Sequence, residues 1–513
     1  MSSEQGTHNS ISASHLDRRR FLKSMAVGTA ALVESPGVLR PESGPLAEAM
    51  SSDKEVFSQR GYYIILSRMP NFGLSDWKAI LNHMQEDQCN FLILWVGGGF
   101  RSRKFPITWQ YNREHRNIEN DFVRDLIDYG HSLGIKIVLG FTPFSYDGVN
   151  QYSLEHPELK AVQKDGTLAK LDGMDCWGYA LNPSRPQAQK FMLEYASEMY
   201  FDFYPNADGL FIESSDYTIC YCPDCIGHYY EREFEFIQAI SNRVWEKQSA
   251  STIIVYPHYF SSAAIPMFGH GVEEKYDPRW TLFFTPHSAP IQKQLVEKAS
   301  KCISWEPMVL GTPEQVKSGC LKAQQSNIGG LVFTLECYSF VSHYPEDDGN
   351  WHLIGSRMKP FGYTWLPDGA DPYGYLLTRV LRIAFREFGR NPNLSLQGYR
   401  SVLKKEIFEE STPASAVDDL LEWQRAYVTN RTWYIPGPVM APQFLAWQLE
   451  LGHVKPTQIE EYQGMLEGLK RIRRKYREPF QDSSVKEMMS GIDWVLAQWE
   501  GKERTFLTIY PNT

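Results

Sequence analysis

The chain has 513 residues, of which 42% are hydrophobic and 14% aromatic, and its formal net charge is −9. This length is more than one small core requires, so one large domain with a smaller one is expected. The acidic balance leaves no basic footprint for a nucleic-acid partner.

The first fifty residues have the pattern of an export leader. Residues 18–23 (RRRFLK) resemble the twin-arginine signal, and the weakly apolar stretch 24–33 after them is too short to span a bilayer. Residues 47–49 (AEA) have the small-x-small pattern of a cleavage site. We expect residues 1–49 to be a leader and the mature protein to be periplasmic or extracellular, with a disordered basic arm as the alternative. No later run reaches the ~18 apolar residues of a membrane helix.

Apolar strands and amphipathic helices alternate along the chain from residue 55. The strands are near-continuous apolar runs, which are typical of strands buried on both faces. Ser75 stands where the first helix needs an N-cap. In chain order the predicted elements are strand 61–67, a helix from 75 through 84, strand 90–95, helix 121–133, strand 135–141, helix 186–200, strand 209–213, helix 226–245, strand 252–256, strand 281–284, helix 291–300, strand 302–305, helix 313–325 and strand 330–334.

Eight strands in such alternation predict an α/β fold of the (β/α)8 TIM-barrel type. The alternative is a doubly wound open sheet, which usually has a glycine-rich phosphate turn after its first strand. Here the segment 67–70 (SRMP) stands in that place. After Pro367, Gly369 and Pro372 the pattern becomes helical throughout. We therefore predict a barrel over residues 55–365 and an α-helical domain over 371–513, with helices at 376–388, 396–408, 416–432, 441–451 and 458–474.

Carboxylates gather at the predicted C-terminal ends of the strands, where barrel enzymes carry their catalytic groups. Glu213 ends the fourth strand with Asp216 close behind, Glu306 follows the seventh strand and Glu336 the eighth. Cleavage of a glycosidic bond needs one acid to protonate the leaving oxygen and a second carboxylate to attack or to activate water. We predict Glu213 as general acid/base and Glu306 as nucleophile or base, with Glu336 as the alternative partner and Asp216 as the alternative acid. Any single one of these acids could instead cap a helix or pair with Arg68.

Other side chains at the same strand ends are candidates for substrate binding. Aromatic rings there would stack on or border a sugar, and the cationic and imidazole groups would hydrogen-bond to its hydroxyls. The two histidines are equally compatible with satisfied core or rim positions. The predicted substrate-binding residues are Arg68, Trp95, Tyr146, Tyr217, His258, His287, Trp305 and Tyr338.

Cys220, Cys222 and Cys225 follow the fourth strand with the spacing C-x-C-x-x-C. Thiolates at this spacing hold a tetrahedral zinc ion, whose fourth ligand would come from Cys176, with His228 as the alternative. A zinc closed by thiolates is structural, so it would anchor the loop, and catalysis would need no cofactor. A disulfide such as Cys222–Cys225 and buried free thiols are the other interpretations.

The stretch 155–225 resembles a run found in bacterial barrel glycoside hydrolases. It contains His-Pro-Glu at 156–158, Asp-Gly at 165–166, Leu-Asn-Pro-Ser at 181–184 and an Asp-Gly strand that ends in Glu213. The cysteine spacing is similar to the zinc-cysteine cluster of family 42 β-galactosidases, and a barrel followed by helices resembles α-glucuronidase-type and hexosaminidase-type enzymes. Glutamates on strands four and seven match the largest clan of retaining barrel glycosidases, although Ile212 stands where that clan usually has Asn. The resemblance implies the glycoside hydrolase superfamily and no particular family.

These features together predict an exported glycoside hydrolase that cleaves oligo- or polysaccharides with two carboxylates. Two other functions are compatible with the same residues. One is a non-catalytic carbohydrate-binding barrel, and the other is a polysaccharide lyase with Tyr and His as base and acid. No oligomeric state follows from the sequence.

Overall fold

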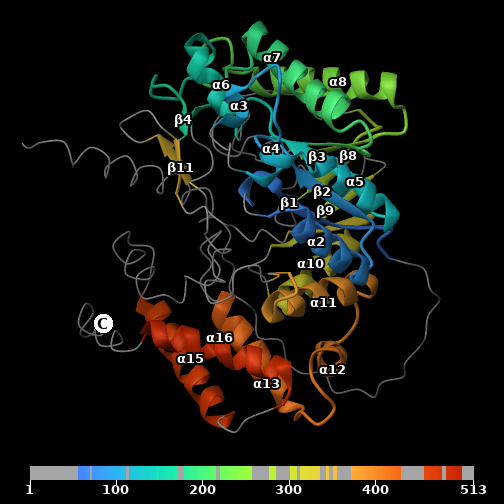
Figure 1. The fold of residues 1–513 in the computed structure, drawn as a ribbon, viewed down its shortest axis with the longest axis vertical. Coiled ribbons are helices and arrows are strands. Elements are labelled where there is room, and N and C mark those ends of the chain that lie inside the picture. The colour runs from blue at the N-terminus through green and yellow to red at the C-terminus, as the bar shows by residue number, and fades with distance from the viewer. Residues whose placement is uncertain are drawn as a thin grey trace, which may run out of the picture.

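A computed structural model of the chain describes most of the barrel and five helices after it (Figure 1). The predicted leader 1–49 lies outside the described residues. The structure describes residues 56–69, 72–110, 115–146, 148–171, 178–214, 220–256, 277–284, 301–308, 312–334, 342–345, 351–354, 371, 373–428, 456–476 and 481–499.

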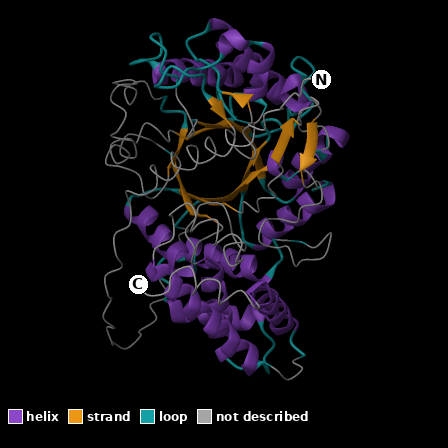
Figure 2. Cartoon of the chain, turned by 90° about the vertical axis from the view of Figure 1, so that its left-hand side faces the viewer, coloured by secondary structure: helices purple, strands orange, loops and turns teal. Residues whose placement is uncertain are grey.

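A closed ring of parallel strands lies at the centre of the fold, and Figure 2 looks into it. Its order is β1-β10-β9-β8-β7-β6-β3-β2, so the last strand in the chain closes the ring against the first. The predicted barrel is confirmed, and the open-sheet alternative is wrong. The strands of the ring are β1 (Gln59–Ile65), β2 (Phe91–Trp95), β3 (Lys136–Phe141), β6 (Gly209–Glu213), β7 (Thr252–Tyr256), β8 (Thr281–Phe284), β9 (Cys302–Met308) and β10 (Gly330–Thr334).

Burial on both faces explains why these segments form strands. All five side chains of β2 are buried, those of one face inside the ring and those of the other under the helices. Gly209 at the start of β6 is required sterically, because a Cβ there would collide with the carbonyl group of Thr252. Its neighbour Asp208 accepts a hydrogen bond from the backbone N–H of Ile137 at 2.8 Å, which aligns β6 with β3. The Asp-Gly pair that opens this strand is therefore structural.

Helices cover the outside of the ring, with α7 and α8 together at one side (Figure 1). The predicted N-cap Ser75 is wrong: α2 begins after Gly73, whose N–H donates to the Asp76 carboxylate at 2.8 Å. The predicted helix 186–200 ends as an α-helix at Ser197 and continues as a π-helical turn, Glu198–Phe203. The helices before the C-terminal part are α2 (Leu74–Glu86), α3 (Ile107–Gln110), α4 (Arg116–Asn120), α5 (Val123–Ser132), α6 (Val149–Glu155), α7 (Pro186–Ser197), α8 (Tyr229–Lys247) and α10 (Pro313–Gln325).

Two small antiparallel sheets lie outside the ring. They had not been predicted because their strands are too short to show a period. The first pairs β4 (Lys170–Leu171) with β5 (Gly178–Tyr179), and the second pairs β11 (Ser342–Pro345) with β12 (Trp351–Ile354).

The part of the chain after the barrel is helical, as predicted, and lies below the ring in Figures 1 and 2. The predicted helices 291–300 and 441–451 lie outside the described residues. The last helix was missed, although its buried Val485, Met488 and Ile492 stand at helical spacing. None of the described helices is long and apolar enough to cross a membrane. The helices of this part are α11 (Leu376–Arg390), α12 (Leu396–Ile407), α13 (Ser415–Val428), α15 (Pro456–Lys475) and α16 (Ser483–Trp499).

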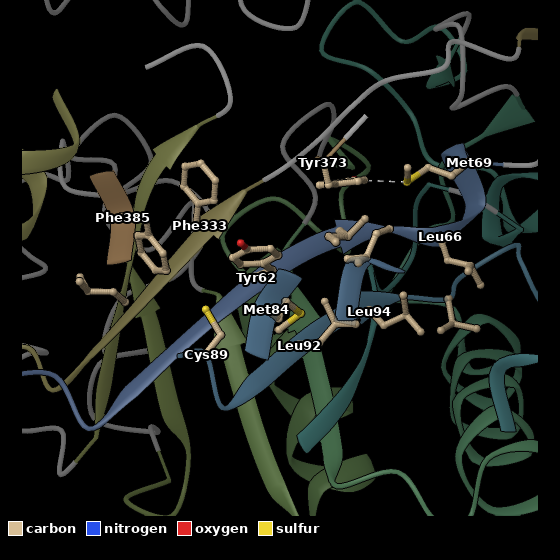
Figure 3. Close-up of a cluster of buried hydrophobic side chains, with 14 of the residues drawn as sticks. Tyr62, Leu66, Met69, Met84, Cys89, Leu92, Leu94, Phe333, Tyr373 and Phe385 are labelled. Carbon is tan, nitrogen blue, oxygen red and sulfur yellow. Dashed lines mark hydrogen bonds between the residues drawn. The ribbon is translucent and has the colours of Figure 1, made fainter. Parts of the chain in front are cut away.

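Helix α11 packs on the outside of the barrel where the ring closes. The ring of Tyr62 on β1 lies 5.8 Å from that of Phe333 on β10 and 6.4 Å from that of Phe385 on α11 (Figure 3). Beside them the buried guanidinium of Arg382 donates from Nε to the equally buried Asp87 carboxylate at 2.8 Å. Apolar packing and a buried ion pair therefore join the helical part to the barrel.

His83 at the edge of this junction should make stability depend on pH. Burial alone would lower the pKa of His83, but hydrogen bonds with Asp371 and Glu86 outweigh it and raise the pKa above 6.5. A raised pKa in the folded state means that the contact stabilises fully below the unfolded value of ~6.5 and is lost as the pH rises through the folded value. We expect Tm to fall as the pH increases from 6 to 8, and His83→Gln to flatten that part of the curve. A slope that is the same in both proteins would contradict this.

Candidate active site

Glu213 ends β6 at the C-terminal end of the ring, and its side chain is only 8% exposed. The hydroxyl of Tyr63 on β1 donates to its Oε2 at 2.9 Å. Ser214, the next residue, donates from its N–H to the Tyr256 carbonyl at 3.2 Å and from Oγ to the fully buried Glu233 carboxylate at 2.9 Å. The carboxylate and the backbone that carries it are thus both held in place.

An aromatic collar inside the ring surrounds Tyr63, the residue that donates to the Glu213 carboxylate. Tyr63 lies at its centre, with its ring centroid 6.3 Å from Trp95, 5.5 Å from Phe211 and 5.6 Å from Trp305. Tyr256 continues the collar at 5.8 Å from Trp305. All four of these contacts are edge-to-face, an arrangement that aromatic quadrupoles favour. The collar fixes the Tyr63 ring and, with it, the hydroxyl that donates to Glu213.

The segment after β3 approaches the collar in a strained conformation. Phe144 and Tyr146 have φ of +63° and +71°, a region that side chains with a Cβ rarely adopt. The Tyr146 ring lies 5.9 Å from the Trp95 ring, so the unusual backbone brings an aromatic side chain to the strand ends. Strain of this kind costs about 1–3 kcal/mol per residue and concentrates at functional sites.

The strand that carries Glu306 has a bulge between Trp305 and Met308. Trp305 on β9 is in register with Val332 on β10, but the next pair is Met308 with Thr334, so β9 has one extra residue there. A bulge re-aims side chains and is common beside active sites. The described backbone therefore runs three residues beyond the predicted end of this strand. The Glu306 side chain lies outside the part of the chain that the structure describes.

The structure brings four of the predicted site residues to one place and leaves most of the others outside its described part. Glu213, Trp95, Tyr146 and Trp305 lie at the same end of the ring. The backbone of Arg68 is described in a short 3-10 turn after β1, but its side chain is not. The predicted residues outside the described ranges are Asp216, Tyr217, His258, His287, Glu336, Tyr338 and Cys176.

Tyr63 and Glu233 are not among the residues predicted from the sequence. Tyr63 lies within an apolar strand, where its pattern is that of any core residue, and only the closed ring brings its hydroxyl to Glu213. Glu233 belongs to the first turns of α8, where the amphipathic pattern suggests an exposed acid. No period of the sequence distinguishes either residue from its neighbours.

Cys220, Cys222 and Cys225 form a compact buried cluster of free thiols. Their sulfur atoms all lie within 4.8 Å of one another. A tetrahedral zinc with Zn–S bonds of ~2.3 Å separates its sulfur ligands by about 3.8 Å, so the three thiols fit such an ion with small adjustments. The hydrogen bond with Cys225 lowers the pKa of the Cys220 thiol to about 6, whereas the same contact raises the pKa of Cys225.

Asn182 links the Leu-Asn-Pro-Ser motif to this cluster. Its Nδ2 donates to the Cys222 sulfur at 3.2 Å, and the Cys225 thiol donates to its Oδ1 at 3.0 Å. The other potential fourth ligand, His228, has its Nδ1 2.8 Å from the Glu231 carboxylate and is not among the grouped ligand atoms of the described residues. The Leu-Asn-Pro-Ser motif at 181–184 therefore supports the cysteine loop through Asn182.

A cavity of about 410 Å³ lies elsewhere, at the junction of barrel and helices. Its lining includes Asp87, Arg382, Arg386 and Glu406. These charges pair with each other: Arg382 with Asp87 at 2.8 Å, and Arg386 with Glu406 at 2.5 Å. The cavity is therefore a feature of the ionic junction and is separate from Glu213.

No protein-family model matches the chain, and no curated protein matches it. Among solved structures, it is similar to a GH138 enzyme targeting pectin rhamnogalacturonan II, with 11% identity, a TM-score of 0.49 and coverage of 87% of this chain and 58% of that one. It is similar to a GH20 exo-β-N-acetylglucosaminidase from Vibrio harveyi, with 11% identity, a TM-score of 0.44 and coverage of 71% and 58%. A third is the Flavobacterium johnsoniae chitobiase, with 13% identity, a TM-score of 0.41 and coverage of 88% and 72%. The chain thus spans less than two thirds of the length of the first two proteins.

Proposed function

We propose that the chain is a glycoside hydrolase in which Glu213 is the general acid/base. The observation that carries this proposal is the buried Glu213 carboxylate at the C-terminal end of a barrel strand, held by the hydroxyl of Tyr63, whose ring is packed in the aromatic collar. A carboxylic acid at this position can protonate the oxygen of a departing sugar and then deprotonate water. The ring of Trp305, which is only partly buried beside Tyr63, is of the kind that borders a pyranose.

The second carboxylate is proposed to be Glu306, as nucleophile or base. The position of Glu306 supports this choice, because it follows Trp305 directly on β9, in the segment where the register with β10 shifts. Glu336 is the alternative partner, and Asp216 the alternative acid. The separation between Glu213 and its partner decides the stereochemistry: ~5–5.5 Å for retention and ~6.5–9.5 Å for inversion. Export by the twin-arginine route, directed by residues 18–23, is part of the same proposal.

Activity on a panel of 4-nitrophenyl glycosides and neutral polysaccharides tests the proposal directly. A glycoside hydrolase consumes one water molecule for each glycosidic bond that it cleaves, and each cleavage releases one new reducing end. Unsaturated products that absorb in the ultraviolet would instead identify a lyase. Binding of glycans without any cleavage would identify a carbohydrate-binding barrel. Either of these last two results would contradict the assignment of Glu213.

We further propose a structural zinc at the cysteine cluster, with Cys176 as the fourth ligand. Its support is the compactness of three buried thiols that a zinc ion fits. We expect metal analysis to find about one zinc per chain, and removal by 1,10-phenanthroline to lower Tm by roughly 5 °C or more. Cys222→Ser should reduce the zinc content, whereas Cys302→Ala, in β9, should keep it. A Cys222–Cys225 disulfide in a metal-free protein would contradict the site.

A further inference from the structure

Three buried polar atoms at the ends of β2 and β3 lack a partner among the described residues. They are Trp95 Nε1, Thr142 Oγ1 and Ser145 Oγ, and each side chain belongs to a residue that is at most 2% exposed. Buried polar groups in native proteins are nearly always hydrogen-bonded, so three in one short stretch of the fold require an explanation. The indoles of Trp77 and Trp423 are also without a partner, but each lies singly on a helix away from the strand ends.

The strand register places Thr142 beside Glu213. Phe141 on β3 is in register with Ile212 on β6, so the next residue of each strand, Thr142 and Glu213, stand at the same level. A Cβ on Gly140 would lie 3.3 Å from the Phe211 ring, which shows that this side of β3 faces the interior of the barrel. Side chains two residues apart lie on the same face of a strand. Thr142 follows Gly140 by two residues, so its side chain lies on the interior side, one layer closer to the end of the barrel.

Trp95 approaches the same region from the neighbouring strand. It is in register with Gly140, two residues before Thr142, and its ring contacts that of Tyr146. Ser145 precedes Tyr146 in the strained turn, which is held by a hydrogen bond from the Leu181 N–H to the Phe144 carbonyl at 2.7 Å. Thr142 thus stands level with the proposed acid, Trp95 lies on the neighbouring strand, and Ser145 lies in the turn that follows β3.

We propose that Trp95, Thr142 and Ser145 form a hydroxyl-binding subsite for an uncharged ligand with neighbouring hydroxyl groups, such as the unsubstituted part of a pyranose ring. An indole N–H only donates, whereas the two hydroxyls donate or accept, and a sugar hydroxyl complements both kinds of group. The three groups carry no formal charge, so they favour a neutral sugar over a uronic acid. This inference rests on the proposed function and adds the residues that select its substrate.

Thr142→Val tests the subsite because valine has almost the same shape and lacks only the hydroxyl. We expect kcat/KM on the best glycoside of the panel to fall by about 10–50-fold, since the bound sugar hydroxyl loses its hydrogen-bond partner. Tm should stay the same or rise, because an unpartnered buried hydroxyl has been removed from the free protein. Ser145→Ala should behave in the same way.

The matched control is Thr108→Val. The Thr108 hydroxyl is equally buried, but it donates to the Phe105 carbonyl at 2.7 Å. Its removal should lower Tm and leave kcat/KM within about two-fold of the wild type. If Thr142→Val follows the control, with a lower Tm and unchanged kcat/KM, the hydroxyl is structural and the inference is overturned.

Binding separates this inference from the proposed function. Titration calorimetry of the Glu213→Gln protein with D-glucose, D-galactose, D-mannose and N-acetyl-D-glucosamine needs no turnover. A sugar that binds this protein and loses about ten-fold or more in affinity when Thr142→Val is added supports the subsite, even if no glycoside is cleaved. An affinity that does not change with Thr142→Val, or no binding of any of the four sugars, would overturn it.

Discussion

Glu213→Gln is expected to lower kcat by about 10²–10⁴-fold on any glycoside that the wild type cleaves, which is the usual contribution of a positioned acid/base. The amide cannot donate and recover a proton as the carboxylic acid does. The fold should be unchanged, because the side chain keeps its size and the Gln carbonyl can still accept from the Tyr63 hydroxyl, 2.9 Å from Oε2 in the wild type. Initial rates at saturating substrate, together with Tm, measure both effects.

Glu235→Gln is the matched control for this experiment. Glu235 is a glutamate on the exposed side of α8, where its carboxylate pairs with Arg232 at 2.9 Å. Its replacement should change neither kcat nor Tm appreciably. Activity of Glu213→Gln within two-fold of the wild type would exclude Glu213 as the acid and move the role to Asp216.

Arg382→Met is expected to destabilise the protein by about 3–5 kcal/mol, because it leaves the Asp87 carboxylate buried without its counter-charge. Arg382 and Asp87 are 3% and 2% exposed, so solvent screens neither charge. The Tyr62 hydroxyl would be the main remaining donor to Asp87. Equilibrium unfolding in urea, followed by tryptophan fluorescence and circular dichroism, gives the change in free energy of unfolding.

Two further variants make this result specific. Arg232→Met removes an exposed ion pair with Glu235 and should cost at most about 1 kcal/mol. Adding Asp87→Leu to Arg382→Met should recover much of the lost stability, because the buried charge then disappears with its partner. If Arg382→Met costs no more than Arg232→Met, the ion pair does not hold the helical part on the barrel.

The strands of the barrel could be predicted from sequence because each is buried on both faces. A run such as that of β2 is apolar at every position, and no exposed face interrupts it. Boundaries set by side-chain contacts were harder to predict. The N-cap of α2 depends on Asp76 reaching back to Gly73, and Ser75 had the residue type favoured at such positions without the geometry.

The π-helical turn after α7 shows the limit of local patterns. Glu198, its first residue, accepts hydrogen bonds from the Ser102 hydroxyl at 2.6 Å and from the Arg103 N–H at 2.9 Å. These donors stand nearly a hundred residues earlier in the chain. A helical period contains no information about such partners, so only the end of the regular helix could be estimated.

The same distinction applies to the candidate site. An acid at the end of an apolar strand is visible in sequence, and the prediction of Glu213 as acid/base rests on that position, which the structure places at the end of β6. Its partner Tyr63 comes from β1, three strands around the ring from β6 and 150 residues away in the chain, and its hydroxyl reaches Glu213 only because the strands close. The orphan hydroxyl of Thr142 is likewise a property of packing, since threonine after a strand is common and usually satisfied.

The order of strands around the ring has a consequence for synthesis of the chain. The first strand finds one of its two neighbours only when β10 appears, and the pairing of Gln59 with Gly330 spans 271 residues, as does the nearby contact of Ser58 with Gly329. At ~5–20 residues per second, the ribosome needs roughly 14–54 s to make that interval. Throughout this time the nascent chain carries an open strand edge of apolar residues, which favours aggregation. Chaperone occupancy of ribosome-bound chains should therefore persist until β10 has left the exit tunnel.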